Sequence, residues 1–197
     1  MPEPLALIPA WARCAVAPLG GALGQCAPHE LAAPVVQGLL RRAGLPAQAV
    51  DAVVAGNAMG AGGNPARLVA LAAGLPERVA TYSVDTQCCA GLDAVALGVG
   101  LIASGQAELV VAGGVEAWSR APIRQHRPRH PGDAPVPFDR PAFAPEPWRD
   151  PDMLWSAAQH ALVQGVTRAA QDAYALQSHA RALQHPVSYT HLRAHET

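Results

Sequence analysis

Apolar and polar residues along the first 115 positions follow the periods of helices and strands in turn. Leucines and valines at helical spacing, with helix-start and helix-stop residues such as Asn64, Pro65 and Gly74, mark helices. Short valine-rich runs with polar or glycine-rich ends mark strands. The pattern predicts helices at residues 29–45, 64–74 and 91–105, and strands at residues 49–57, 79–84 and 108–115.

The strand, helix and strand between residues 79 and 115 predict a βαβ unit whose two strands form a parallel pair. The helix of this unit, residues 91–105, is apolar around most of its circumference, so cover is expected on all its sides. This part of the chain is therefore expected to be an α/β domain with a covered sheet.

The pattern changes after Val115. Residues 121–152 are rich in proline and arginine and are expected to run over the surface. Two helices are predicted after them, at residues 153–164 and 167–184, the second with Thr167 as its N-cap. The last residues, 185–197, contain three histidines and have no core-like periodicity.

Composition and charge disfavour several classes of function. The net charge is −1 and all 14 basic residues are arginine, a balance that favours neither nucleic acid nor a membrane as partner. The most apolar segment, residues 94–103, is too short to span a bilayer, and the start of the chain has no basic segment typical of a secretory signal. The four cysteines show no disulfide framework, which favours a reducing cytoplasm.

Histidines and arginines between residues 120 and 130 form two further candidate sites. His126 and His130 have a metal-ligand spacing for a helix, but the prolines around them disfavour a helix and no third ligand completes a set. No metal site is expected. The arginines either lie on a solvent-exposed loop without a binding role or attract the phosphate groups of a ligand. They stand at positions 120, 124, 127 and 129.

Two adjacent cysteines, Cys88 and Cys89, stand where a predicted strand ends and a predicted helix begins. The free N–H groups and the positive end of a helix stabilise a thiolate. Ala90 and Gly91 are small, so a carbonyl group can approach the backbone closely. The pattern suits a cysteine that accepts an acyl group, and it also suits two small buried residues.

Five blocks of sequence, in order between about Leu7 and Leu183, resemble the N-terminal half of the thiolases. The sequence departs from the family at Cys14 and Ala15, at Asp85, where an asparagine is usual, and at Trp118, which replaces a methionine. The blocks are "ARCAVAPLGGAL", "GNAMGAGGNPARLVALAAGLP", "VDTQCCAGLDAV", "VVAGGVEAWSRAP" and "VTRAAQDAYALQSHARA".

The resemblance implies an α/β, thiolase-like fold of which this chain holds the N-terminal half-domain and part of the loop domain. The half-domain is expected to be an incomplete mixed sheet with helices on both faces. Its core is expected at residues 1–118, the partial loop domain that covers substrate at 119–184, and a tail unlike the family at 185–197. The strand that would complete the sheet is expected after residue 184.

The resemblance also implies acyl transfer between coenzyme A thioesters, as thiolysis of 3-ketoacyl-CoA or condensation of acetyl-CoA, with no cofactor besides these substrates. Cys88, three residues before Gly91, stands at the nucleophile's position, and Met153 stands near the acyl path. The related ketoacyl synthase III enzymes would select Cys89 instead. A non-catalytic module derived from a thiolase is the third alternative.

Thiolases need more than one thiol, and they carry a histidine and a second cysteine in their C-terminal half, in Gly-His-Pro and Cys-x-Gly-Gly-Gly blocks. Neither block occurs in this sequence. The 197-residue chain is therefore expected to be inactive alone. For the full-length enzyme the family implies a homodimer or homotetramer.

Overall fold

The computed structural model describes residues 5–60 and 62–184, which form two compact units that divide after Pro122. The predicted tail at residues 185–197 lies outside the described residues. Within the described residues no helix is both long and apolar enough to cross a membrane.

The first unit is built on a three-stranded parallel sheet. Strand β1 (Ala52–Gly56) lies in the centre, between β2 (Ala80–Val84) and β3 (Val110–Gly114). The strands pair in register along their whole length, so their carboxyl ends meet at one edge of the sheet. All five residues of β1 are buried, which is the pattern of a strand covered on both faces.

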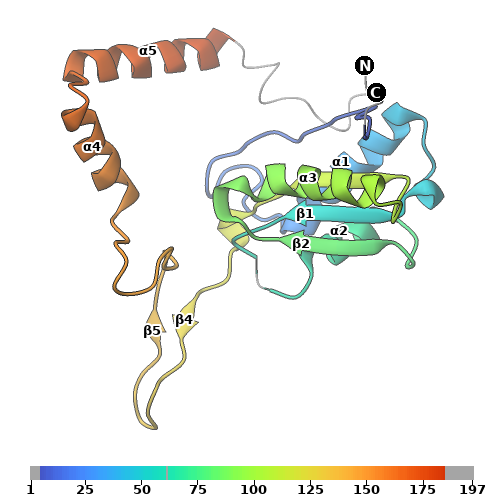
Figure 1. Cartoon of the computed structure of the whole chain (residues 1–197), viewed down its shortest axis with the longest axis horizontal. Coiled ribbons are helices and arrows are strands. Elements are labelled where there is room, and N and C mark those ends of the chain that lie inside the picture. The colour runs from blue at the N-terminus through green and yellow to red at the C-terminus, as the bar shows by residue number, and fades with distance from the viewer. Residues whose placement is uncertain (1–4, 61, 185–197) are drawn as a thin grey trace. The chain divides into compact units, whose positions relative to one another are not determined.

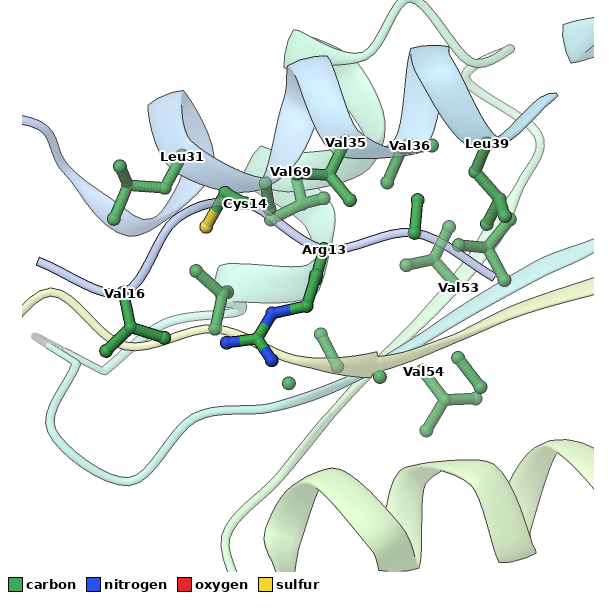
Figure 2. Close-up of a pocket in the computed structure, with 18 residues that line it drawn as sticks. Arg13, Cys14, Val16, Leu31, Val35, Val36, Leu39, Val53, Val54 and Val69 are labelled. Carbon is green, nitrogen blue, oxygen red and sulfur yellow. The ribbon is translucent and has the colours of Figure 1, made fainter. Parts of the chain in front are cut away.

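Helices cover both faces of this sheet (Figure 1). Helices α1 (Pro28–Ala43) and α2 (Pro65–Ala72) lie on one face, and α3 (Ala90–Ala103) lies on the other. Successive residues of a strand point to opposite faces, and Figure 2 shows Val53 on the side of α1 and α2 and Val54 on the side of α3. A core cluster lies between the sheet and the first two helices; its members from these elements include Ala33, Val36, Leu40, Val53, Ala55, Val69, Ala70 and Val111.

Local sequence signals account for the start of α2. Asn64 is the N-cap, and its Oδ1 accepts a hydrogen bond from the N–H of Arg67 at 3.3 Å, while Pro65 occupies the first helical position. The Asn64 side chain also donates to the Thr81 carbonyl at 3.0 Å and accepts from Ser83 Oγ at 2.7 Å. The residue that begins the helix therefore also ties it to β2.

The structure contains each helix and strand predicted for this unit, with bounds close to those predicted. The predicted pairing of the strands at 79–84 and 108–115 is wrong, because β1 lies between β2 and β3. Both strands run parallel, as predicted, but each pairs with β1, whose fully buried side chains fit the central position. The strand that would complete the predicted mixed sheet is expected after residue 184, beyond the described residues.

Asp51 joins the segments that precede β1 and β3. Its Oδ2 accepts hydrogen bonds from the N–H groups of Glu108 at 2.9 Å and Leu109 at 3.0 Å, and Arg78 lies 3.9 Å from its Oδ1. The two backbone N–H groups, with a smaller contribution from Arg78, hold the pKa of Asp51 below its usual value of 3.8.

This bonding makes the stability of the first unit depend on pH. Because the folded-state pKa of Asp51 is lowered, its stabilisation is present above about pH 4 and is lost as pH falls through the folded-state pKa. We expect Asp51→Asn to lower the urea midpoint of unfolding at pH 7, and the difference from wild type to shrink progressively below pH 4. A difference that stays constant between pH 7 and pH 2 would contradict this role.

The second unit consists of short elements and two exposed helices. Strands β4 (Gln125–His126) and β5 (Val136–Pro137) form an antiparallel hairpin within residues 121–152, where no strand was predicted. The helices are α4 (Met153–Val163) and α5 (Arg168–Gln184), and neither contains a buried residue. The predicted N-cap is confirmed, because Thr167 Oγ1 accepts from the Ala170 N–H at 3.2 Å.

Candidate active site

The carboxyl ends of the three parallel strands are joined by Asn57, the residue that follows β1. Its N–H donates to the Val84 carbonyl of β2 at 3.0 Å, and its side-chain Nδ2 donates to the Val115 carbonyl after β3 at 2.8 Å. Asn57 is only 8 % exposed. A Cβ at Gly60 would lie 2.0 Å from Asn57 Oδ1, so glycine is required where this turn folds back over the asparagine.

Glu116 fixes the same turn from the other side. Its Oε1 accepts hydrogen bonds from the N–H of Ala58 and, at 3.2 Å, from that of Met59. Glu116 is itself exposed, so the turn that it anchors is a surface feature. Asn57 and Glu116 together hold the loops after β1 and β3 against each other.

Three glycines bring the first turn of α3 directly onto the strand ends. A Cβ at Gly56 would lie 2.5 Å from the carbonyl carbon of Ala90 and 2.7 Å from the N of Gly91. A Cβ at Gly114 would lie 3.1 Å from the Cα of Gly91. Any side chain at Gly56 would therefore collide with the helix backbone, and the start of α3 is held close to the sheet by this contact.

The segment between β2 and α3 carries both candidate nucleophiles. A 3-10 turn, Gln87–Cys89, leads directly into α3, and both Cys88 and Cys89 are exposed. The alternative of two buried structural cysteines is therefore wrong for this structure. The exposed thiols stand beside the helix N-terminus at the carboxyl edge of a parallel sheet, the edge at which open α/β sheets bind ligands.

Met153, predicted to line the acyl path, lies in the second unit as the first residue of α4. It is 65 % exposed, and Asp152 before it caps the helix by accepting from the Trp155 N–H at 2.8 Å. Its role toward substrate remains a prediction.

The histidines at 126 and 130 do not lie on a helix, and the His126 ring stacks on Phe138 with 4.3 Å between ring centroids. The described residues contain no cluster of three or more metal-binding side chains.

The sequence matches the family described as "Thiolase, N-terminal domain" over residues 6–189, which is most of its length. The chain belongs to the thiolase family. The five blocks quoted above lie within the matched residues, and the block that contains Cys88 is one of them.

Several thiolase relatives are similar over most of this chain. A putative acetyl-CoA C-acetyltransferase, VraB, of Staphylococcus aureus strain MRSA252 is 37 % identical over 176 residues, which cover 88 % of this chain and 46 % of the relative. A second, YhfS, of Bacillus subtilis strain 168 is 39 % identical over 162 residues, which cover 82 % and 40 %. This chain thus spans about half the length of the curated relatives it matches.

A solved structure agrees with the thiolase fold. The crystal structure of an acetyl-CoA acetyltransferase of Bacillus anthracis superposes with a TM-score of 0.78 at 35 % identity, over 92 % of this chain and 47 % of that one. The predicted α/β, thiolase-like fold of the N-terminal half, incomplete in this chain, is confirmed.

The first unit also contains a cavity of about 320 Å³ between the sheet and the segment that precedes α1 (Figure 2). Apolar residues of α1, β1 and α2 line it, together with Arg13 and Cys14 from the segment before α1. Five consecutive residues, Val111 to Val115, also line it, so residues from both faces of β3 contribute to the lining. Neither Cys88 nor Cys89 lines this cavity, which separates it from the candidate nucleophiles.

Proposed function

We propose that this chain is the N-terminal part of an acyl-CoA acyltransferase of the thiolase type, with Cys88 as the acyl acceptor. The observation that carries the proposal is the exposed position of Cys88 before α3, in the sequence block that corresponds to the thiolase nucleophile. The names of the relatives, acetyl-CoA C-acetyltransferases, support acetyl-CoA and coenzyme A as substrates. No further cofactor is proposed, because coenzyme A thioesters are themselves the substrates.

The proposed step is a thioester exchange. The Cys88 thiolate attacks the carbonyl carbon of acetyl-CoA, the bond between that carbon and the coenzyme A sulfur breaks, and the departing thiolate takes up a proton. The acetyl group is then held on Cys88 as a thioester. Glycine at position 91 and alanine at position 90 leave room for the carbonyl beside the backbone.

Completion of the reaction needs groups that this sequence does not contain. A base must remove the thiol proton, and an acid–base group must manage the α-proton of the second acyl group. The family resemblance assigns these roles to a histidine and a cysteine in the C-terminal half, and neither motif occurs in the 197 residues. We therefore propose that the chain alone is acetylated slowly, because solvent must take up the thiol proton in place of the histidine, and that it does not turn over.

Incubation with acetyl-CoA should thus acetylate one cysteine once, without further turnover. After incubation of the native 197-residue chain with acetyl-CoA, we expect peptide mass spectrometry to find the acetyl group on Cys88 at least about fivefold more often than on Cys89, since one thiol alone lies at the nucleophile position. Cys88→Ala should abolish the selective label and Cys89→Ala should retain it. Repeated release of coenzyme A is not expected.

The other outcomes separate the alternatives. A label on Cys89 with Cys88 free would favour an acyltransferase of the ketoacyl synthase III type. A label distributed over Cys14, Cys26, Cys88 and Cys89 as in the urea-denatured chain would favour a non-catalytic module. Thiolysis of acetoacetyl-CoA by the purified chain, lost in Cys88→Ala, would show that another residue supplies the base.

A further inference from the structure

Gln87, the residue directly before Cys88, has an unusual backbone conformation. Its φ is 57°, and it is the one non-glycine residue with a positive φ in the part of the chain that the structure describes. The left-handed region is unfavourable for a residue with a side chain longer than that of asparagine or aspartate, so neighbouring contacts must hold it there. The direction in which the Cys88 side chain leaves the backbone depends on this torsion.

Two side-chain hydrogen bonds bracket the strained residue. On one side, Asp85 Oδ1 accepts from the N–H of Gln87 itself at 3.0 Å. On the other, Thr86 Oγ1 donates to Asp93 Oδ2, and Asp93 lies in the first turn of α3. The Thr86–Asp93 bond spans both cysteines and joins the residue before Gln87 to the helix that follows them.

The helix end of this bond is packed on the sheet. The first turn of α3 lies close to the backbone of Gly56 and Gly114, so Asp93 extends from a part of the helix that cannot move closer to the strands. Thr86 is exposed. Its hydroxyl therefore acts as a tether between the turn and the helix that is packed on the sheet.

We propose that Thr86 and Asp93 are positioning residues for Cys88, which they present at the helix N-terminus by holding Gln87 in its left-handed conformation. The proposal rests on the role of Cys88 proposed above. Without the tether, Gln87 returns to a negative φ, and this rotates the Cys88 side chain relative to α3. Cys89, which is the N-cap of α3 and one residue nearer the helix, is affected less.

The test measures which of the two thiols reacts, with a probe that involves no coenzyme A. The native 197-residue chain is treated briefly with iodoacetamide at pH 7.5, and the ratio of alkylation at Cys88 to that at Cys89 is read by peptide mass spectrometry, with the same measurement in 8 M urea as reference. We expect Thr86→Val, which has the same shape but no hydroxyl, to reduce the native ratio about tenfold. Thr86→Ser keeps a hydroxyl and should stay within about twofold of wild type.

A second pair of variants tests the other end of the bond. Asp93→Asn retains an oxygen that accepts from Thr86 and should preserve the ratio, whereas Asp93→Ala should reduce it as far as Thr86→Val does. Circular dichroism spectra equal to wild type would show that the fold persists. A merely structural role would lower stability without changing the ratio between adjacent thiols.

Three results would overturn the proposal: a wild-type ratio equal to that in urea, an unchanged ratio in both Thr86→Val and Asp93→Ala, or an equal loss in Thr86→Ser and Thr86→Val. A different result would contradict the proposed acyltransferase function while leaving the positioning role of Thr86 and Asp93 intact. If the ratio responds as expected but acetyl-CoA labels neither cysteine selectively, the tether stands and the acyltransferase assignment falls.

Discussion

Replacing Gly56 with alanine is expected to destabilise the first unit by about 3 kcal/mol, at the upper end of the usual cost of overpacking. The added Cβ would lie 2.5 Å and 2.6 Å from the carbonyl carbon and oxygen of Ala90, well inside van der Waals contact. Both atoms belong to the helix backbone, so no flexible side chain can move aside, and the whole first turn of α3 must lift from the sheet. Urea unfolding followed by circular dichroism measures the change.

The matched control for this substitution is Gly100→Ala, a change of the same size in α3, the helix that Gly56 approaches. A Cβ at Gly100 would meet nothing within 4 Å. Alanine in a helix interior is more favourable than glycine, so this variant should gain about 0.5–1 kcal/mol. Equal stabilities of Gly56→Ala and wild type would mean that α3 stands farther from β1 than the structure places it.

Gly56→Ala should also change the chemistry at the turn. Because the turn with Cys88 is joined to α3, lifting the helix moves the thiol away from the strand ends. The iodoacetamide ratio of Cys88 to Cys89 should then approach its value in urea, as in Thr86→Val. Gly100→Ala should leave that ratio unchanged.

The helices and strands of the first unit could be predicted because their signals are local. Asn64 and Pro65 mark the start of α2 in any context, since the cap bond forms between residues three positions apart. The order of strands could not be predicted in this way. Whether β2 pairs with β1 or with β3 depends on which strand is buried on both faces, and that is decided by packing across the whole sheet.

The residues of the candidate site likewise differ in whether a local sequence signal could predict them. The motif around Cys88 identified the candidate nucleophile, but the residues that shape its surroundings carry no motif. Asn57 is identifiable as a polar residue at the end of an apolar strand, yet its bonds to Val84 and Val115 join segments 27 or more positions away. Thr86 and Asp93 became visible as a pair only when the fold brought their side chains together.

One side of α3 is exposed and apolar, which favours self-association of the chain. This helix turns Ala90, Ala94 and Gly98 toward the sheet, and its outward side is also apolar. Leu92 is 74 % exposed and Leu97 is 50 % exposed. The sequence predicted a helix covered on all sides, and the described residues of the first unit leave one side open.

We therefore expect the isolated 197-residue chain to self-associate through this face. Burial of a leucine side chain is worth roughly 1.5–3 kcal/mol, so covering both leucines in each copy supplies several kcal/mol toward association. In size-exclusion chromatography with light scattering, wild type should elute at twice the monomer mass or more. The double variant Leu92→Gln, Leu97→Gln should shift toward the monomer with an unchanged circular dichroism spectrum.

The comparison that makes this result specific is Leu176→Gln on α5, where the leucine is 71 % exposed but lies in the second unit. If any exposed leucine could drive association, this variant would also reduce the molar mass measured by light scattering. If the outward face of α3 drives it, Leu176→Gln should elute like wild type, because that face remains intact. A monodisperse monomer for the wild-type chain, with slow hydrogen exchange across residues 91–103, would show instead that the small sheet and its three helices are stable with this apolar face in water.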